Sequence, residues 1–210
     1  MICKQKTVIG LTGGIGSGKT AVLDILKKEY DATIIEADKL GHELQLPEHS
    51  VYMDIIACFG ENILDEPKTV GVSRIDRKSL GNIVFNDSCK LAKLNQIMHP
   101  AIHKMVEQII ADSNSRLIVV EAAILTSTSL VDLVDEVWYI YCHRDVRIDR
   151  LKKYRGLEYE KALSVMNNQP SEEEFIDNSK VRIDNSGSID ETRNQISKAL
   201  ERIYEEELYG

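Results

Sequence analysis

A parallel α/β fold is predicted by three features of this sequence of 210 residues. Short apolar, β-branched runs recur along the chain, helical patterns lie between them, and a glycine-rich turn joins the first run to the first helical pattern. Strands that alternate with helices favour one parallel sheet, because each connecting helix packs on a face of that sheet. We therefore predict a parallel five-stranded sheet with helices on both faces.

The five expected strands are all short. They span residues 7–12, 32–36, 117–121, 136–142 and 181–184. After the last one, Ile189, Ile196, Leu200 and Ile203 recur at helical spacing, which predicts an amphipathic helix that closes the chain.

The glycine-rich turn fits the phosphate-binding pattern G-x-x-x-x-G-K-[ST] through Gly13, Gly18, Lys19 and Thr20. In a P-loop of this kind, backbone N–H groups converge on the phosphates at the start of the next helix. We expect Lys19 to reach the β and γ phosphates and Thr20 to offer a hydroxyl to Mg²⁺. The residues expected to bind ATP in this turn are Gly14, Ile15, Gly16, Ser17, Gly18, Lys19, Thr20 and Ala21. An ordinary glycine-rich turn is the alternative.

Two acidic residues follow expected strands at the sheet edge where ligands of such folds bind. Asp38 lies just past 32–36, and it is either a base that accepts the proton of a hydroxyl nucleophile or a helix N-cap. Glu121 ends 117–121, and it either serves Mg²⁺ binding or holds N–H groups of the next loop. Thr20 and Glu121 are thus the candidate metal residues.

A single P-loop kinase-type domain is expected, with two additions to its core. The core comprises about 1–38, 115–150 and 178–210. Residues 39–114 are too many for a simple crossover and predict a helical insertion that forms a wall of the acceptor site, or one that serves packing alone. Within it, Pro100 is expected to kink or restart a helix. Residues 150–177 are expected to form a lid.

Composition and charge narrow the class of protein. Charged residues make up 29% and hydrophobic ones 43%, and no apolar run reaches the length of a bilayer span. The first residues lack a secretory pattern, and the four cysteines form no C-x-x-C pair. A net charge of −8 argues against a nucleic-acid partner. We expect a cytoplasmic protein that binds neither membranes nor nucleic acid.

Several motifs occur in an order and at a spacing that resemble the dephospho-CoA kinase family across nearly the whole chain. They are "IGLTGGIGSGKT", "EADKLGHEL", "RIDRKSLGNIVF", "LNQIMHPAI" and "VRIDNSGS". The resemblance implies transfer of the γ-phosphoryl group of ATP to the ribose 3'-hydroxyl of dephospho-coenzyme A. In family terms, Thr12 and Asp38 lie beside the acceptor ribose, with Asp38 as the base, and Asn185 lies near the nucleotide base.

The resemblance also implies that the helical insertion is a CoA-side domain. Arg77, Phe85 and His99 belong to it and are the expected substrate contacts. For Arg77, a guanidinium suits the phosphates of the substrate, whereas an exposed ion pair with Asp76 is the alternative. For His99, a helix cap or a hydrogen-bonded core residue is the alternative to a substrate contact.

Departures from the family pattern gather in the expected lid. Tyr154 stands where the second arginine of R-L-x-x-R is usual, Val165 replaces a frequent arginine and Phe175 a frequent lysine. Some other cation must then face the transferred phosphoryl group, and Arg155 is the first candidate, with Arg150 the second. After the third strand, the usual D-x-P-L-L-F-E is replaced by "EAAILTSTSL".

Three classes of function stay open at this point. The first is a dephospho-CoA kinase with altered lid chemistry. The second is another small-molecule or nucleotide kinase on the same scaffold, and the third is a nucleotide-binding protein without catalysis. The presence of Lys19, Thr20 and Asp38 favours an enzyme, because a binding module needs no base at the acceptor.

Overall fold

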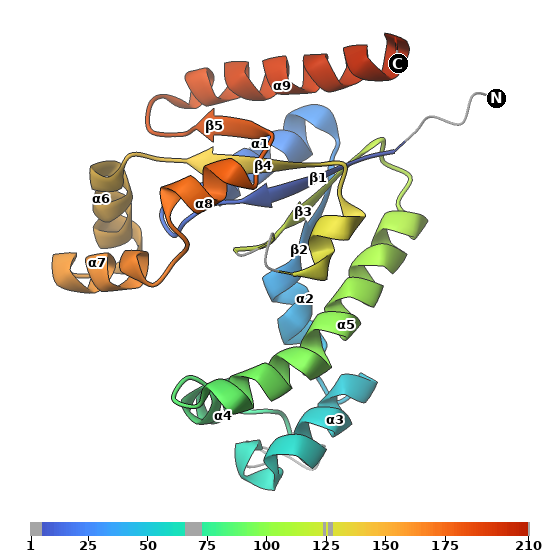
Figure 1. The fold of residues 1–210 in the computed structure, drawn as a ribbon, viewed down its shortest axis with the longest axis vertical. Helices are drawn as coiled ribbons and strands as arrows, with labels where there is room; N and C mark the ends of the chain where they lie inside the picture. The colour runs from blue at the N-terminus through green and yellow to red at the C-terminus, as the bar shows by residue number, and fades with distance from the viewer. Residues whose placement is uncertain (1–5, 66–72, 124, 126–127, 210) are drawn as a thin grey trace. The chain divides into compact units, whose positions relative to one another are not determined.

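The predicted sheet is confirmed in the computed structural model, which describes residues 6–65, 73–123, 125 and 128–209. Its strands are β1 (Thr7–Thr12), β2 (Thr33–Glu36), β3 (Leu117–Glu121), β4 (Glu136–Tyr141) and β5 (Val181–Asp184). They lie in the order β2-β3-β1-β4-β5 in one parallel sheet with helices on both sides (Figure 1). β2 begins one residue later and β4 ends one residue earlier than the sequence predicts.

The chain forms two compact units. The larger unit comprises Met1–Ile35 and Ser113–Gly210, and the smaller one comprises Glu36–Asp112. The helices of the larger unit are α1 (Lys19–Tyr30), η3 (Ser129–Leu133), α6 (Arg144–Arg155), α7 (Tyr159–Asn167), α8 (Glu172–Asp177) and α9 (Ile189–Tyr209). The smaller unit holds α2 (Ala37–Glu43), α3 (Ser50–Phe59), η1 (Glu61–Ile63), α4 (Arg77–Val84) and α5 (Ser88–Asp112). None of the described helices has the length and apolarity needed to span a bilayer.

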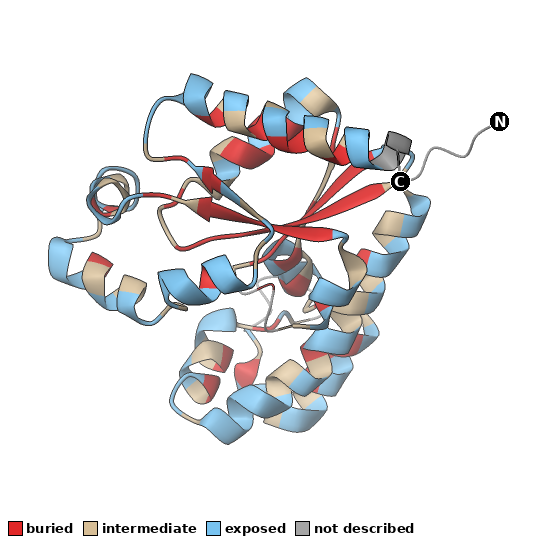
Figure 2. Ribbon diagram, turned by 45° about the horizontal axis from the view of Figure 1, so that its top comes forward, coloured by how far each residue is buried: buried red, intermediate tan, exposed pale blue. Residues whose placement is uncertain are grey.

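The core of the larger unit is built on the central strands. Every residue of β1 is buried, as expected for a central parallel strand that is covered on both faces (Figure 2). Leu26 of α1, Trp138 of β4 and Leu200 of α9 belong to one cluster of buried side chains with Ile9 and Leu11 of β1. This packing holds the carboxyl end of β1, and therefore the glycine-rich turn, in a fixed place.

The smaller unit has a core of its own. Ile55, Ile63, Leu80 and Met98 are buried together, one from each of α3, η1, α4 and α5. Of the two expectations for Pro100, a kink or a restart of the helix, the restart is wrong, because α5 runs through Pro100 as one helix of 25 residues. The packing of α5 on this core stabilises the helix by more than the loss of one backbone hydrogen bond at a proline destabilises it.

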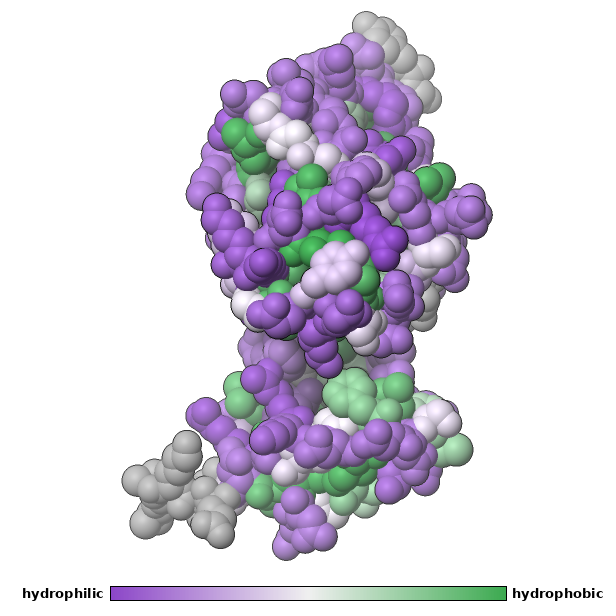
Figure 3. All heavy atoms as spheres, turned by 90° about the vertical axis from the view of Figure 1, so that its left-hand side faces the viewer, coloured by the Kyte–Doolittle hydropathy of each residue, from purple (hydrophilic) through white to green (hydrophobic). Residues whose placement is uncertain are grey.

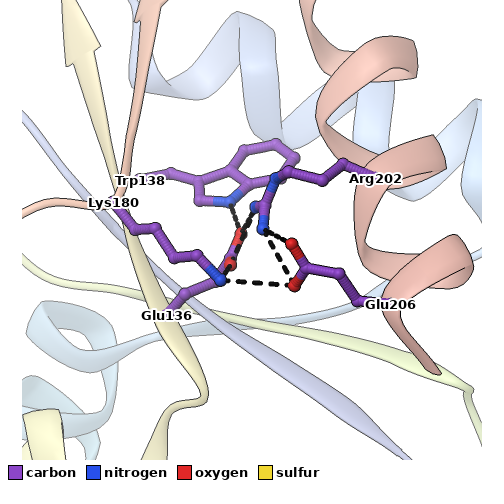
Figure 4. A network of polar contacts seen from close by, with 5 residues as sticks. All are labelled: Glu136, Trp138, Lys180, Arg202 and Glu206. Atoms are coloured by element: carbon purple, nitrogen blue, oxygen red, sulfur yellow. Dashed lines mark hydrogen bonds and ion pairs between the residues drawn. The ribbon is translucent and has the colours of Figure 1, made fainter. Parts of the chain in front are cut away.

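A buried carboxylate fastens the last helix to the sheet. Glu136, at the start of β4, accepts hydrogen bonds from Trp138 Nε1 at 2.6 Å and from Arg202 Nη2 at 2.6 and 2.8 Å (Figure 4). Lys180 Nζ lies 3.2 Å from the same carboxylate, and both cations also contact Glu206. Burial raises the pKa of Glu136, but the hydrogen bonds from Arg202, Trp138 and Lys180 outweigh it, so that the pKa lies below its ordinary value.

Glu136→Gln is expected to lower the free energy of unfolding near pH 7 by about 2 kcal/mol, because charged hydrogen-bond donors lose their anionic acceptor. A lowered folded-state pKa stabilises the protein above the unfolded-state value, and that stability is lost as the pH falls through the folded-state value. The difference between the parent and this variant should therefore shrink below the ordinary glutamate value of 4.5. Urea unfolding at several pH values measures it. Glu206→Gln, at an exposed position, is the control and should change little; equal losses in both variants contradict the prediction.

Candidate active site

The glycine-rich turn joins β1 directly to α1. Gly14, Ile15, Gly16, Ser17 and Gly18 form this turn, and Lys19, Thr20 and Ala21 open α1. Gly18 has a φ of +89°, and a Cβ atom there would overlap the Asn185 side chain. Only glycine meets both conditions, so the second glycine of the phosphate-binding pattern is required by the geometry.

Lys19 is held at the mouth of the turn. Its Nζ donates to Gly13 O at 2.9 Å and lies 3.5 Å from Glu121 Oε1 at the end of β3. The two charged side chains are only 18% and 10% exposed. Parallel pairing of β1 with β3 sets Glu121 beside Leu11, which explains how residues about 100 positions apart form this pair. The charge of Lys19 is therefore paired with the Glu121 carboxylate next to the turn.

Oxygen donors are available for a phosphate and a hard cation. Ser17 Oγ is buried and has no hydrogen-bond partner among the described residues, so it can accept or donate one more bond. Thr20, in the first turn of α1, is exposed. With the Glu121 carboxylate, the Thr20 hydroxyl gives the oxygen donor types that Mg²⁺ prefers, and the residues fit that ion.

The side chain of Asn185 is hydrogen-bonded to the backbone of the turn. It is buried, and its Nδ2 donates to Ser17 O at 2.8 Å while its Oδ1 accepts from Thr192 Oγ1 at 3.0 Å. Arg150 of α6 donates to Ser17 O at 3.1 Å and to Asn185 O at 2.8 Å. The resemblance implied that Asn185 lies near the nucleotide base, and the structure adds that its amide is engaged with the turn itself.

A second set of side-chain contacts, which the sequence did not predict, holds the turn at Ile15. Arg147 Nε donates to Ile15 O at 2.9 Å, and Gln169 Oε1 accepts from both Ile15 N at 2.8 Å and Arg147 Nη2 at 3.1 Å. The backbone N–H and the backbone C=O of Ile15 are thus each hydrogen-bonded to a side chain. Arg147 belongs to no motif, and its position three residues before Arg150 on the same helix is the one signal that points to it.

Thr12 is the last residue of β1 and is buried. Its Oγ1 donates to Ala123 O at 3.2 Å, in the segment that follows β3. The hydroxyl thus ties the end of β1 to that segment. Of the stretch "EAAILTSTSL", residues 124, 126 and 127 lie outside the described residues.

In the smaller unit, Asp38 is exposed in the first turn of α2. The helix begins at Ala37 with Glu36 as the residue before it, so the N-cap alternative for Asp38 is wrong. His42 follows one turn later. Burial lowers the pKa of His42, the positive charge of Arg77 lowers it further, and the negative charge of Asp38 opposes both. Asp38 and Arg77 therefore share one electrostatic neighbourhood.

The other expected substrate contacts of this unit are also exposed. Phe85 follows α4 with 82% of its surface exposed, and His99 is exposed within α5. His99 is neither a cap nor a core residue, which removes its structural alternatives. Figure 3 shows hydrophobic side chains at the surface of the smaller unit among hydrophilic ones. Arg77 opens α4, where Asp76 caps the helix by accepting from Lys78 N and Ser79 N.

A family model described as dephospho-CoA kinase matches residues 7–191 of the chain. The chain belongs to the dephospho-CoA kinase family. It is therefore related to ATP-dependent kinases, and the presence of the turn and of Lys19 agrees with this membership.

Relatives of the same family match almost end to end. The dephospho-CoA kinase of Carboxydothermus hydrogenoformans is 38% identical over 198 residues, which cover 93% of each chain. The structure of a dephospho-CoA kinase from Campylobacter jejuni has a TM-score of 0.66 and 27% identity, covering 95% of this chain and 98% of that one. A Thermus thermophilus structure, TT1252, shares the fold with a TM-score of 0.79 at 23% identity, covering 94% of this chain and 98% of the other.

The segment expected to form a lid carries its departures from the family pattern on three helices, α6, α7 and α8. Tyr154 is 72% exposed on α6, and Arg155 is exposed at the end of that helix. Val165 is half-buried in α7. Phe175 is buried and stacks on the ring of Tyr139 at 4.9 Å between centroids, and burial raises the pKa of Tyr139 to about 12. Phe175 thus forms an aromatic pair with Tyr139 at a position where lysine is frequent in the family pattern.

Proposed function

We propose that the chain phosphorylates the ribose 3'-hydroxyl of dephospho-coenzyme A with ATP, the last step of coenzyme A synthesis. The observation that carries this proposal is the position of Lys19, which is held within 2.9 Å of Gly13 O at the mouth of the turn, in a chain that matches the family over residues 7–191. A bound triphosphate offers Lys19 more negative charge than Glu121 does, and the lysine then moves to the β and γ phosphates.

In the proposed reaction, the carboxylate of Asp38 accepts the proton of the ribose 3'-hydroxyl. The hydroxyl oxygen forms a bond to the γ-phosphorus as the bond between that phosphorus and the β–γ bridging oxygen breaks, and ADP leaves. Asp38 is free for this role because it is exposed and not a helix cap. Thr12 is proposed to lie beside the same ribose and to fix the end of β1 through its bond to Ala123.

Mg²⁺ is the proposed metal cofactor, with Thr20 and Glu121 as its protein-side residues. When bound, the ion neutralises charge on the β and γ phosphates. The Thr20 hydroxyl is proposed to contact the ion directly, whereas Glu121 is longer than the usual aspartate and is proposed to act on the ion through water. Release of Lys19 by ATP would leave the Glu121 carboxylate available for that role.

The acceptor is proposed to be recognised by the smaller unit. Arg77 brings a guanidinium that suits phosphate groups, Phe85 an exposed aromatic ring, and His99 an exposed imidazole. Asn185 is proposed to lie beside the nucleotide base while it braces the turn.

A panel of acceptors tests this function. The purified protein is mixed with Mg·ATP and with dephospho-CoA, nucleosides or nucleoside monophosphates, and products are identified by mass spectrometry. The proposal expects CoA from dephospho-CoA and far slower transfer to the others. A preferred nucleoside or nucleoside monophosphate contradicts it in favour of another kinase, and ATP binding without any product contradicts it in favour of a binding protein.

Arg155→Ala is expected to lower turnover at least about tenfold, because Arg155 is the proposed source of the lid charge that Tyr154 does not provide. Tyr154→Arg should raise turnover or restore the loss in the double variant, since one charge facing the phosphoryl group is then supplied from the neighbouring position. Steady-state rates of the two single variants and the double variant test this. Parent-like rates for Arg155→Ala would show that the cation comes from elsewhere; Lys153→Ala, which removes an exposed charge from the same helix, is the control.

A further inference from the structure

Arg147 contacts the phosphate-binding turn in a manner that its hydrogen bonds alone do not explain. A Cβ atom added to Gly14 would overlap the guanidinium group, so this cation lies directly against the front of the turn. Nε and Nη2 are used on Ile15 and Gln169, while Nη1 donates to no described residue. One edge of the guanidinium, at Nη1, therefore keeps N–H donors without a described partner next to the glycine-rich turn.

Among the described residues, the charge of Arg147 has no ion-pair partner. The side chain is half-buried, and no carboxylate of the described residues lies within ion-pair distance of it. Glu172, which acts on Arg147 from further away, is paired with Arg182 at 3.7 Å. Burial lowers the pKa of Arg147, which reports the cost of keeping this cation away from water. A buried cation without a carboxylate is stabilised when an anion binds next to it.

Two other features of the turn suit a bound anion. Ser17 Oγ is buried without a described partner in the same turn, and the turn itself is of the kind that directs N–H groups at phosphate. Positions 154 and 175, where the family pattern favours cations, hold a tyrosine and a phenylalanine. Phe175 stacks on Tyr139, whose phenol is one of the groups that act electrostatically on Arg147.

We infer that Arg147 is a nucleotide-binding residue that contributes positive charge to the polyphosphate of ATP. The inference rests on the proposed function, in which the turn binds ATP. It differs from the role proposed for Arg155, because Arg147 contacts the turn directly through Ile15 O.

A charge role and a bracing role predict different results. Arg147→Gln removes the charge and Gln169→Ala removes the other half of the brace on Ile15 without a change of charge. Arg147→Lys keeps the charge but not the planar group. Titration calorimetry with Mg·ATP, with inorganic tripolyphosphate and with adenosine gives dissociation constants for each variant, and thermal unfolding reports folding.

The inference expects Arg147→Gln to weaken ATP and tripolyphosphate about tenfold or more, with adenosine unchanged. Arg147→Lys should stay within about threefold of the parent because it retains the charge, and Gln169→Ala should weaken both ligands less than Arg147→Gln does. Equal weakening in Arg147→Gln and Gln169→Ala would overturn the inference and leave a brace only. An unchanged ATP affinity in Arg147→Gln would overturn it too. The product assay on the parent is separate: a parent that binds ATP but makes no CoA contradicts the proposed function and not this inference.

Discussion

Lys19→Ala is expected to abolish measurable phosphoryl transfer and to weaken ATP binding severely, by about 10² or more. The parent side chain is the charged group held at the mouth of the turn, between Gly13 O and the Glu121 carboxylate. Its removal takes the mobile cation from the β and γ phosphates and also leaves Glu121, which is 10% exposed, without this ion pair. Product formation and ATP dissociation constants measure the two effects.

Lys27→Ala, on an exposed site of the same helix, is the matched control and should behave as the parent. Glu121→Gln combined with Lys19→Ala separates the two losses, because the double variant no longer carries the carboxylate that the Lys19 charge contacted. Transfer should stay absent in the double variant even if its stability returns. Undiminished turnover in Lys19→Ala would contradict the assignment of the turn as the phosphate site.

Asp38→Asn is expected to lower turnover by about 10² or more while ATP affinity stays within a few-fold. The amide has the shape of the carboxylate but cannot accept the proton of the ribose hydroxyl. Because Asp38 is exposed and caps no helix, the substitution should leave the thermal unfolding of the protein unchanged. Steady-state rates and calorimetry with ATP test this difference between kcat and binding.

Asp54→Asn is the control for this variant, since Asp54 is an exposed aspartate of α3 in the same unit. It should change neither rate nor affinity. If Asp38→Asn turns over at the rate of the parent, Asp38 is not the base. If it loses ATP binding as well as turnover, its charge serves the nucleotide and not the acceptor.

The sheet was predictable because its signal is local. Runs such as "VIGL" and "LIVV" are apolar at every position, as is typical of central parallel strands, and the ends of the five strands agree with the structure to within a residue. Pro100 was not predictable in this way. A proline signals a break in isolated helices, whereas α5 is held by packing on Ile55, Leu80 and neighbouring side chains that no local pattern reveals.

The sequence predicts the part of the site that lies within a motif, but it does not predict contacts between side chains that are distant in the sequence. The pattern from Gly13 to Thr20 locates the turn, but the partners of that turn come from distant segments: Glu121 through strand pairing, and Gln169 across 154 positions from Ile15. Arg147 was missed for the same reason. Its bond to Ile15 O depends on how α6 packs on the turn; its position three residues before Arg150 indicates a shared face of α6 but not that contact.

Transfer of a labelled phosphoryl group tests the central claim most directly. The purified protein is incubated with dephospho-CoA and Mg·ATP that carries ¹⁸O in the γ-phosphoryl group, and the product is fragmented in a mass spectrometer. The account predicts ADP and CoA, with the labelled phosphoryl group on the ribose 3'-oxygen. Labelled inorganic phosphate with unchanged dephospho-CoA, or label at another oxygen of the acceptor, would contradict it.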